Sequence, residues 1–217
     1  MARRSDDPVA VDIHVDPSCP WAWLTWNWLQ QVAAVRPLAL TTRVFSLAEI
    51  NRDREKDERS RAAHQAGERA LRCLVAAERE GGSPALTALY REIGEAYQER
   101  AEPLGDEAVL RACAAAAGLD PELAGRALAD PATLIALAEA HRTAVDAGAF
   151  GVPTVRVEGG PAFFGPIIDR RMEQEAAAQL WDHLAWLLAQ QPLFEIKRGR
   201  PGGAQVGRHR LAGAARG

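Results

Sequence analysis

Residues 11–21 read Val-Asp-Ile-His-Val-Asp-Pro-Ser-Cys-Pro-Trp. The alternation of apolar and polar residues from Val11 to Val15 predicts a β-strand with one buried face. Asp16-Pro17-Ser18 is a turn signal. Pro20 suits the first position of a helix, because its missing N–H would have no partner there anyway. The sequence therefore predicts a strand that passes through a tight turn into a helix, with Cys19 at the junction.

The segment that follows extends this pattern into a βαβ unit. Residues 21–35 predict a helix, since apolar residues recur along one stripe: Leu24, Trp28, Val32 and Val35. Pro37 ends this helix. Residues 38–47 (Leu-Ala-Leu-Thr-Thr-Arg-Val-Phe-Ser-Leu) predict a second strand.

Residues 57–148 are rich in Ala, Leu, Glu and Arg, and breaks at 81–84, 103–105, 118–121 and 130–131 divide them into about five helices. Residues 154–158 and 162–164 flank a glycine pair and predict a hairpin, and residues 173–190 predict an amphipathic helix. The order is βαβ, a helical block and ββα, which indicates an α/β fold. From Arg198 the chain is rich in Gly, Arg and Ala without periodicity, which predicts a disordered tail.

The bulk composition excludes several classes of protein. A formal net charge of −3 over 217 residues gives no electrostatic reason to expect a nucleic acid or an anionic membrane as partner. The N-terminus has no apolar segment suited to a signal peptide, and no stretch approaches the roughly 20 apolar residues of a membrane span. We therefore expect a cytoplasmic protein. The three cysteines form neither a disulfide framework nor a ligand pattern, so we expect no metal site.

Cys19 is the candidate nucleophile. At a helix N-terminus the unpaired N–H groups and the helix dipole stabilise a thiolate, so we expect a pKa below the ordinary value of about 8.5. Only the thiolate is an effective nucleophile at neutral pH. The alternative, an inert packing residue, suits Cys73 and Cys113 better, since both lie among alanines and leucines in predicted helices.

Gly151-Val152-Pro153-Thr154 directly precedes the third predicted strand. A proline that enters a strand cannot donate a ladder hydrogen bond, and a cis peptide bond is one reason to find it there. Val-Pro-Thr alone is a weak signal. Together with Cys19-Pro20 in this topology it becomes a strong one.

These features resemble the DsbA-like branch of the thioredoxin superfamily, and within it the actinobacterial mycothiol-dependent nitroreductases. The resemblance runs from Val11 to Arg198. It rests on residues 16–21 (Asp-Pro-Ser-Cys-Pro-Trp), 45–48 (Phe-Ser-Leu-Ala) with Asn51, 151–154 (Gly-Val-Pro-Thr), 162–166 (Ala-Phe-Phe-Gly-Pro), 180–182 (Leu-Trp-Asp) and 194–198 (Phe-Glu-Ile-Lys-Arg).

The resemblance implies a thioredoxin fold in residues 1–52 and 149–197, with an all-helical domain inserted at 53–148 between the second and third strands, and the tail at 198–217. It also implies a cytosolic enzyme, often a homodimer, that takes electrons from a small thiol such as mycothiol rather than from a flavin. By this resemblance Cys19 attacks a small electrophilic substrate and Pro153 faces it as a cis-proline. The residues implied to bind substrate or thiol are Pro20, Trp21, Asn51, Val152 and Thr154.

One departure from the family motif matters for the chemistry. The motif is Cys-Pro-Trp-Cys, whereas this chain has Cys-Pro-Trp-Ala, with Ala22 in place of the second cysteine. The second thiol normally resolves a mixed disulfide, so here an external thiol must release Cys19. Ala22 is either an engineered replacement that traps a mixed disulfide or the native residue of a monothiol enzyme, and we favour the second. Cys73 or Cys113 could substitute only if the fold brought one of them beside Cys19.

A monothiol site leaves three functions open. The leading one is a thiol-dependent oxidoreductase or nitroreductase in which mycothiol is both reductant and resolving thiol. The second is a thiol-assisted cis–trans isomerase: a thiolate adds to an electron-poor C=C bond, the resulting single bond rotates, and elimination gives the other isomer without net redox change. The third is a non-enzymatic binder, which the joint presence of Cys19-Pro20 and Pro153-Thr154 disfavours.

Three further residues have competing interpretations. Trp21 is a candidate aromatic wall over a flat substrate, against exposed packing. His14 on the first strand is a candidate base for Cys19, although a histidine on a strand is more often structural. Trp28 fits the apolar stripe and is expected in the core.

Overall fold

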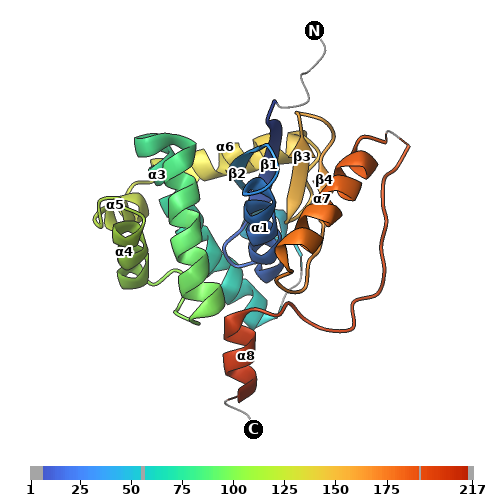
Figure 1. Cartoon of the computed structure of the whole chain (residues 1–217). Coiled ribbons are helices and arrows are strands. Elements are labelled where there is room, and N and C mark those ends of the chain that lie inside the picture. Colours follow the sequence, from blue (N-terminus) through green and yellow to red (C-terminus); the bar gives the residue numbers. More distant parts are fainter. Residues whose placement is uncertain (1–6, 55–56, 191, 215–217) are drawn as a thin grey trace.

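The computed structural model describes residues 7–54, 57–190 and 192–214, with side chains as far as residue 211. Its strands are β1 (Val9–Val15), β2 (Leu38–Val44), β3 (Thr154–Val157) and β4 (Phe163–Phe164). They form one sheet in the order β2-β1-β3-β4, with helices around it (Figure 1). β1 runs parallel to β2 and antiparallel to β3, and β3 and β4 form an antiparallel hairpin. This arrangement confirms the predicted βαβ and ββα halves.

The helices are α1 (Pro20–Ala33), α2 (Leu47–Ile50), α3 (Glu58–Gly94), the π-helical turn η1 (Glu95–Glu99), α4 (Glu107–Ala116), α5 (Leu123–Ala129), α6 (Ala132–Asp146), α7 (Gln174–Leu188) and α8 (Gly207–Ala214). As predicted, the segment between β2 and β3 is helical. The second strand is shorter than expected because Ser46 caps α2, with its hydroxyl oxygen accepting a hydrogen bond from the Glu49 N–H at 3.1 Å.

The long helix α3 crosses from one face of the sheet to the other at the β2 edge. Gly82, within the predicted break at 81–84, has φ +68° and kinks the helix there. Before the kink, Glu78 pairs with Arg43 at 3.9 Å. After it, the Thr87 hydroxyl donates a hydrogen bond to Thr42 at 3.2 Å. Successive strand residues point to opposite faces, so the two halves of α3 contact opposite faces of β2.

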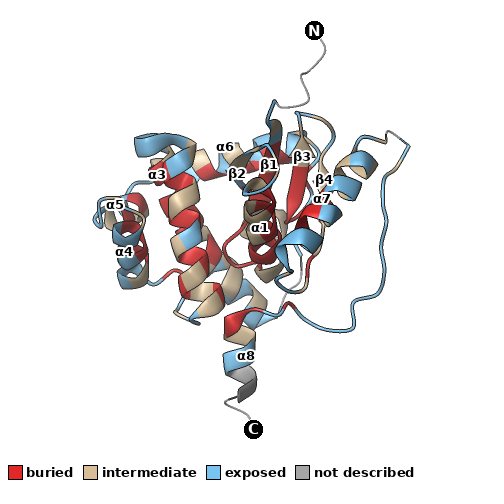
Figure 2. Ribbon diagram, viewed as in Figure 1, coloured by how far each residue is buried: buried red, intermediate tan, exposed pale blue. Residues whose placement is uncertain are grey.

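The core around α1 fixes the rotation of this helix. Trp23, Trp26 and Trp28 are buried, as Figure 2 shows in red for much of α1. Their three indole N–H groups donate, in order, to Glu99 Oε1 at 2.8 Å, Thr42 Oγ1 at 3.0 Å and the Ala177 carbonyl at 3.0 Å. A buried N–H without an acceptor is costly, so these bonds favour one orientation of α1. The orientation of α1 in turn positions Cys19 at its start, and the burial of Trp28 confirms its predicted place in the core.

The segment after Arg198 differs from the disorder that its composition predicts. Ala204 and Val206 are buried, and α8 packs against η1. Figure 1 shows the chain running from α7 along the outside of the molecule to α8. Composition alone could not reveal this docking, because it depends on contacts with η1, which lies far away in the sequence.

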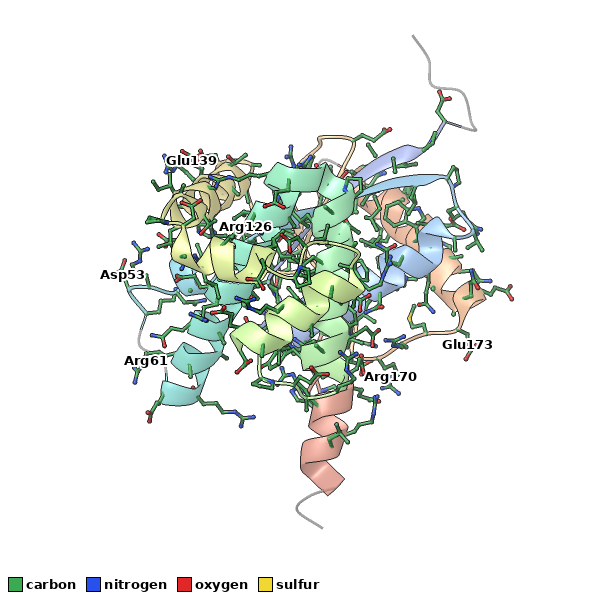
Figure 3. All side chains as sticks on the ribbon, turned by 90° about the vertical axis from the view of Figure 1, so that its left-hand side faces the viewer. Asp53, Arg61, Arg126, Glu139, Arg170 and Glu173 are labelled. Atoms are coloured by element: carbon green, nitrogen blue, oxygen red, sulfur yellow. The ribbon has the colours of Figure 1, made fainter. Side chains whose placement is uncertain are left out.

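Charged side chains are spread over the outside of the molecule. Figure 3 shows Asp53, Arg61, Arg170 and Glu173 projecting from different parts of the surface. Positive and negative side chains form ion pairs on this surface, such as Arg36 with Asp182 at 2.8 Å. Within the described ranges, no helix has the length and apolar character needed to cross a membrane.

Candidate active site

Cys19 is the N-cap residue of α1. Its backbone is extended (φ −89°, ψ 111°), and its Sγ atom accepts a hydrogen bond from the Ala22 N–H at 3.4 Å. The Cys19 N–H donates to the Asp16 carbonyl at 2.9 Å, which closes the turn that the sequence predicts. Pro20 occupies the first helical position. The strand-turn-helix junction inferred from residues 11–21 is therefore present.

The loop before β3 lies opposite this junction. The Val152–Pro153 peptide bond is cis, and the Cys19 thiol donates to the Val152 carbonyl at 3.6 Å. The Thr154 hydroxyl donates to the Gly151 carbonyl at 2.7 Å, and this hydrogen bond within the loop stabilises its conformation. The fold thus brings together the two segments that the sequence singled out.

Burial, rather than the helix terminus, dominates the ionisation of Cys19. The residue is 7% exposed, and burial raises the pKa of its thiol from 9.0 to about 11. The N–H groups of Ala22 and Trp21 lower this pKa, while the Asp16 carboxyl raises it. The predicted low pKa is wrong for this conformation, because the loss of solvent outweighs the favourable helix terminus. At neutral pH the resting group is a thiol.

Two further groups near Cys19 were missed by sequence reasoning. Asp16 is buried and accepts hydrogen bonds from the Ser18 N–H and hydroxyl and from the Leu47 N–H at 2.7–2.8 Å. Burial raises the pKa of Asp16. Tyr90 has a buried hydroxyl without a hydrogen-bond partner among the described residues, and burial, reinforced by Cys19 and Asp16, raises its pKa. Asp16 looked like a turn residue, and no local pattern connects Tyr90 on α3 to Cys19.

Trp21 and Asn51 lie on neighbouring elements. Trp21 is partly buried, and the Arg200 guanidinium lies over its ring at 5.1 Å from the centroid. Asn51 ends α2, where its side-chain amide donates to the Leu47 carbonyl at 2.8 Å. The Leu47 N–H bond to Asp16 ties α2 to the Cys19 turn. A binding role for Trp21 and Asn51 stays a prediction.

His14 lines a separate cavity of about 330 Å³, together with Asp12, Arg43, Glu78, Ala140 and other residues. Cys19 is not part of its lining. Burial lowers the pKa of His14, so its imidazole is neutral over a wider pH range than usual. Its role as a base for Cys19 stays a prediction.

The other two cysteines are buried in the helical block. Burial raises the pKa of Cys73 to about 12 and that of Cys113 to about 11. Cys113 is close enough to Cys73 to raise the pKa of its thiol. Neither Cys73 nor Cys113 is among the main influences on the pKa of Cys19. In the part of the chain that the structure describes, no cluster of three His, Cys, Asp or Glu side chains could hold a metal ion.

Comparison with known proteins agrees with this geometry. Residues 18–198 match the family described as Rv2466c-like, mycothiol-dependent nitroreductase Rv2466c. The chain belongs to this family. It is also 30% identical over 188 residues to the uncharacterized protein Rv2286c of Mycobacterium tuberculosis, a match that covers 87% of this chain and 81% of that protein.

Solved structures share the fold at low sequence identity. A probable DsbA oxidoreductase from Streptomyces coelicolor matches with a TM-score of 0.59 and 22% identity, over 91% of this chain and 98% of that one. A 2-hydroxychromene-2-carboxylate isomerase matches with a TM-score of 0.60 and 16% identity, over 82% and 95%. The cytosolic disulfide reductase DsbM from Pseudomonas aeruginosa matches with a TM-score of 0.52 and 17% identity, over 85% of this chain and 100% of that one. The family member described here therefore has the DsbA-like thioredoxin fold.

Proposed function

We propose that the protein is a thiol-dependent oxidoreductase with Cys19 as its single nucleophilic sulfur and a small thiol as its source of electrons. The approach of Cys19 Sγ to the Val152 carbonyl, at 3.6 Å, carries this proposal, because it sets the sulfur between a helix N-terminus and the Pro153 loop. Membership of a mycothiol-dependent nitroreductase family supports redox chemistry and favours mycothiol as the thiol.

The residues beside Cys19 fit a small thiol. The loop from Val152 to Thr154 presents backbone next to the sulfur, and the Tyr90 hydroxyl has unused hydrogen-bonding capacity among the described residues. Two small thiols supply the two electrons, and the first of them provides the second sulfur that Ala22 does not. The proposed cleft residues are Pro20, Trp21, Asn51, Val152 and Thr154.

The proposed reduction balances with two external thiols. Cys19 Sγ, as thiolate, bonds to the electrophilic atom of the substrate. A thiolate from solution attacks Cys19 Sγ, the bond between sulfur and substrate breaks, and its electron pair leaves with the product, which takes up protons. Cys19 is then held in a mixed disulfide. It is released when a second external thiol attacks, forming the small-molecule disulfide. Each substrate reduced consumes two thiols.

Ala22 favours one alternative function, thiol-assisted cis–trans isomerisation. Its side chain lies at the position where the second sulfur of the motif would stand, and it cannot take part in redox chemistry. Addition of the Cys19 thiolate to an electron-poor C=C bond, rotation and elimination need no second sulfur and leave the thiol pool unchanged.

Thiol consumption separates these two functions. The purified protein is incubated with mycothiol and either a nitroaromatic compound or a cis-polyene, and thiol loss is measured against product. We expect thiol loss in proportion to reduced product, and no product with Cys19→Ser. Isomerised product with a constant thiol concentration would refute the reductase and support the isomerase.

We also infer a cytoplasmic, homodimeric enzyme without flavin or metal. The cytosolic location of the structurally similar reductase DsbM and the family's use of a small thiol support this view. Light scattering on the purified chain tests the dimer, and an absorption spectrum tests for flavin.

A further inference from the structure

The carboxyl-terminal segment reaches the candidate site through specific contacts. Gln205 N–H donates to the Asp169 carbonyl at 2.7 Å, and Gly207 N–H donates to Glu99 Oε2 at 2.9 Å. Val206, between them, is buried. These contacts dock the start of α8 on η1 and on the segment between β4 and α7.

Gly207 makes this docking possible. A Cβ atom at this position would lie 2.2 Å from the Glu99 carbonyl oxygen, which is backbone and cannot move aside cheaply. By contrast, a Cβ at Gly202 in the same segment would have no atom within 4 Å. A larger side chain at Gly207 therefore releases the segment, and the same change at Gly202 does not.

Docking places Arg208 beside the Cys19 turn. Its Nε–H donates to Gln98 Oε1 at 2.7 Å, and its guanidinium lies over the Tyr97 ring at 4.5 Å from the centroid. Gln98 is fully buried, and its amide donates to the Pro17 carbonyl at 2.7 Å. One side chain thus connects Arg208 to the turn that carries Cys19.

The charge of Arg208 is not matched by a carboxylate among the described residues. Burial lowers the pKa of Arg208. Of the neighbouring groups, Tyr97 and Cys19 raise it and Arg59 lowers it. Arg200 from the same segment lies over Trp21, two residues after Cys19. Two arginine side chains of the carboxyl-terminal segment therefore lie beside residues that flank Cys19. A partly buried guanidinium favours an anionic partner with two oxygens.

We propose that Arg208 binds a carboxylate of the small molecule that reacts at Cys19. The inference rests on the proposed function and narrows its substrate class to electrophiles that carry a carboxylate. The Nε–H bond to Gln98 and the Tyr97 ring hold the guanidinium in place, and its terminal N–H groups donate to the carboxylate.

Two alkylating reagents test this proposal without any assumption about the natural substrate. Iodoacetate and iodoacetamide offer the same carbon and leaving group, but only iodoacetate carries a carboxylate. In both cases Cys19 Sγ bonds to the CH₂ carbon, iodide leaves with the electron pair, and the thiol proton passes to buffer. The rate of modification at Cys19 is measured by mass spectrometry for each reagent, and the ratio of the two rates reports recognition of the carboxylate.

We expect Arg208→Met to lower the iodoacetate-to-iodoacetamide ratio at Cys19 about tenfold, as for the loss of one hydrogen bond to a charged group, and Arg208→Lys to restore part of it. Gly207→Leu should lower the ratio similarly while raising the iodoacetamide rate, because it releases the segment. Gly202→Leu is the matched control and should change neither rate.

The outcomes separate this inference from the proposed function. If Cys19 is alkylated but the ratio is the same in Arg208→Met and in the parent protein, carboxylate recognition by Arg208 is refuted and the nucleophile stands. If Cys19 stays unmodified in every variant while Cys73 or Cys113 reacts, the nucleophile itself is wrong and both proposals fall.

Discussion

At Cys19, two opposing effects act on one sulfur atom. The N-terminal N–H groups of α1 stabilise a thiolate, and the nearly complete loss of solvent destabilises it. The second effect is larger, so the resting site holds a protonated thiol. Any event that hydrates the sulfur or brings a cation closer will shift it towards the reactive form.

This balance predicts the pH dependence of Cys19 alkylation. With a pKa of about 11, the rate with iodoacetamide should keep rising until the pH approaches that value. The raised pKa also means that the neutral buried thiol stabilises the fold fully below the ordinary pKa of a cysteine, and that this contribution is lost as the pH rises towards 11. Peptide mass spectrometry across pH gives the rates. A plateau reached already at neutral pH would contradict the expected pKa.

Ala22→Cys tests the meaning of the incomplete motif. Ala22 N lies 3.4 Å from Cys19 Sγ, so a sulfur at this position is expected to form a disulfide with Cys19. After challenge with a small disulfide, the variant should lose the mixed disulfide on Cys19 without added thiol, whereas the parent protein should keep it. Ala22→Ser is the control, since a hydroxyl of similar size cannot resolve the bond. Equal persistence in all three proteins would show that the position is badly placed for resolution.

The Cys19–Pro153 pair could be predicted because each half has a local signature. Cys19 precedes a helix-starting proline, and Pro153 enters a strand. The ionisation of Cys19 could not be predicted in the same way. It depends on Asp16 and on how much solvent the whole fold excludes, and a short stretch of sequence shows neither.

At the level of elements, α1 and α3 meet through a glycine. A Cβ at Gly94 would lie 2.2 Å from the Trp23 ring. Alanine is about 1 kcal/mol better than glycine inside a helix, but overpacking a core costs about 1–3 kcal/mol. We therefore expect Gly94→Ala to lower the free energy of unfolding, as measured by urea denaturation. Glu139→Ala, at an exposed position of α6 (Figure 3), should change it by less than about 0.5 kcal/mol. A stabilised Gly94→Ala would show that α1 and α3 can separate freely.

The boundaries of the helices could be predicted where glycine and proline residues mark a break. The breaks at 103–105 and 118–121 separate helices as expected, since glycine and proline act locally. The expected break at 81–84 only kinks α3, at Gly82, and does not end it. α2 and α8 were not predicted. α2 is a single turn defined by the Ser46 cap, and α8 depends on Gly207 fitting against Glu99.

For the whole molecule, Glu99 on η1 joins α1 to α8. Its carboxylate accepts hydrogen bonds from the Trp23 indole at 2.8 Å and the Gly207 N–H at 2.9 Å, and it pairs with Arg210 at 3.6 Å. Glu99→Ala should lower the free energy of unfolding by about 1–3 kcal/mol, because the buried Trp23 N–H loses its acceptor. Amide hydrogen exchange over residues 204–211 should accelerate.

The docking of α8 on Glu99 is expected to weaken at low pH. Burial raises the pKa of Glu99, but the hydrogen bonds from Trp23 and Gly207 outweigh it and leave the pKa below its ordinary value. Docking is therefore favoured above that ordinary value and is lost as the pH falls through the lowered pKa. Glu102→Ala, which removes a surface pairing with Arg100, is the control and should leave exchange unchanged. Unchanged exchange in Glu99→Ala would mean that Val206 and the Gln205–Asp169 and Arg208–Gln98 bonds anchor the segment without Glu99.

The kinked helix α3 also affects how copies of this molecule can meet. β2 is an outer strand, and outer strands invite another chain to pair with them and extend the sheet into aggregates. Here α3 packs across both faces of β2, and the strand at the opposite side, β4, has only two residues. Neither edge of the sheet therefore offers a long, uncovered strand with which another chain could pair. Growth into fibrils is therefore disfavoured, and a second subunit is expected to attach through helices.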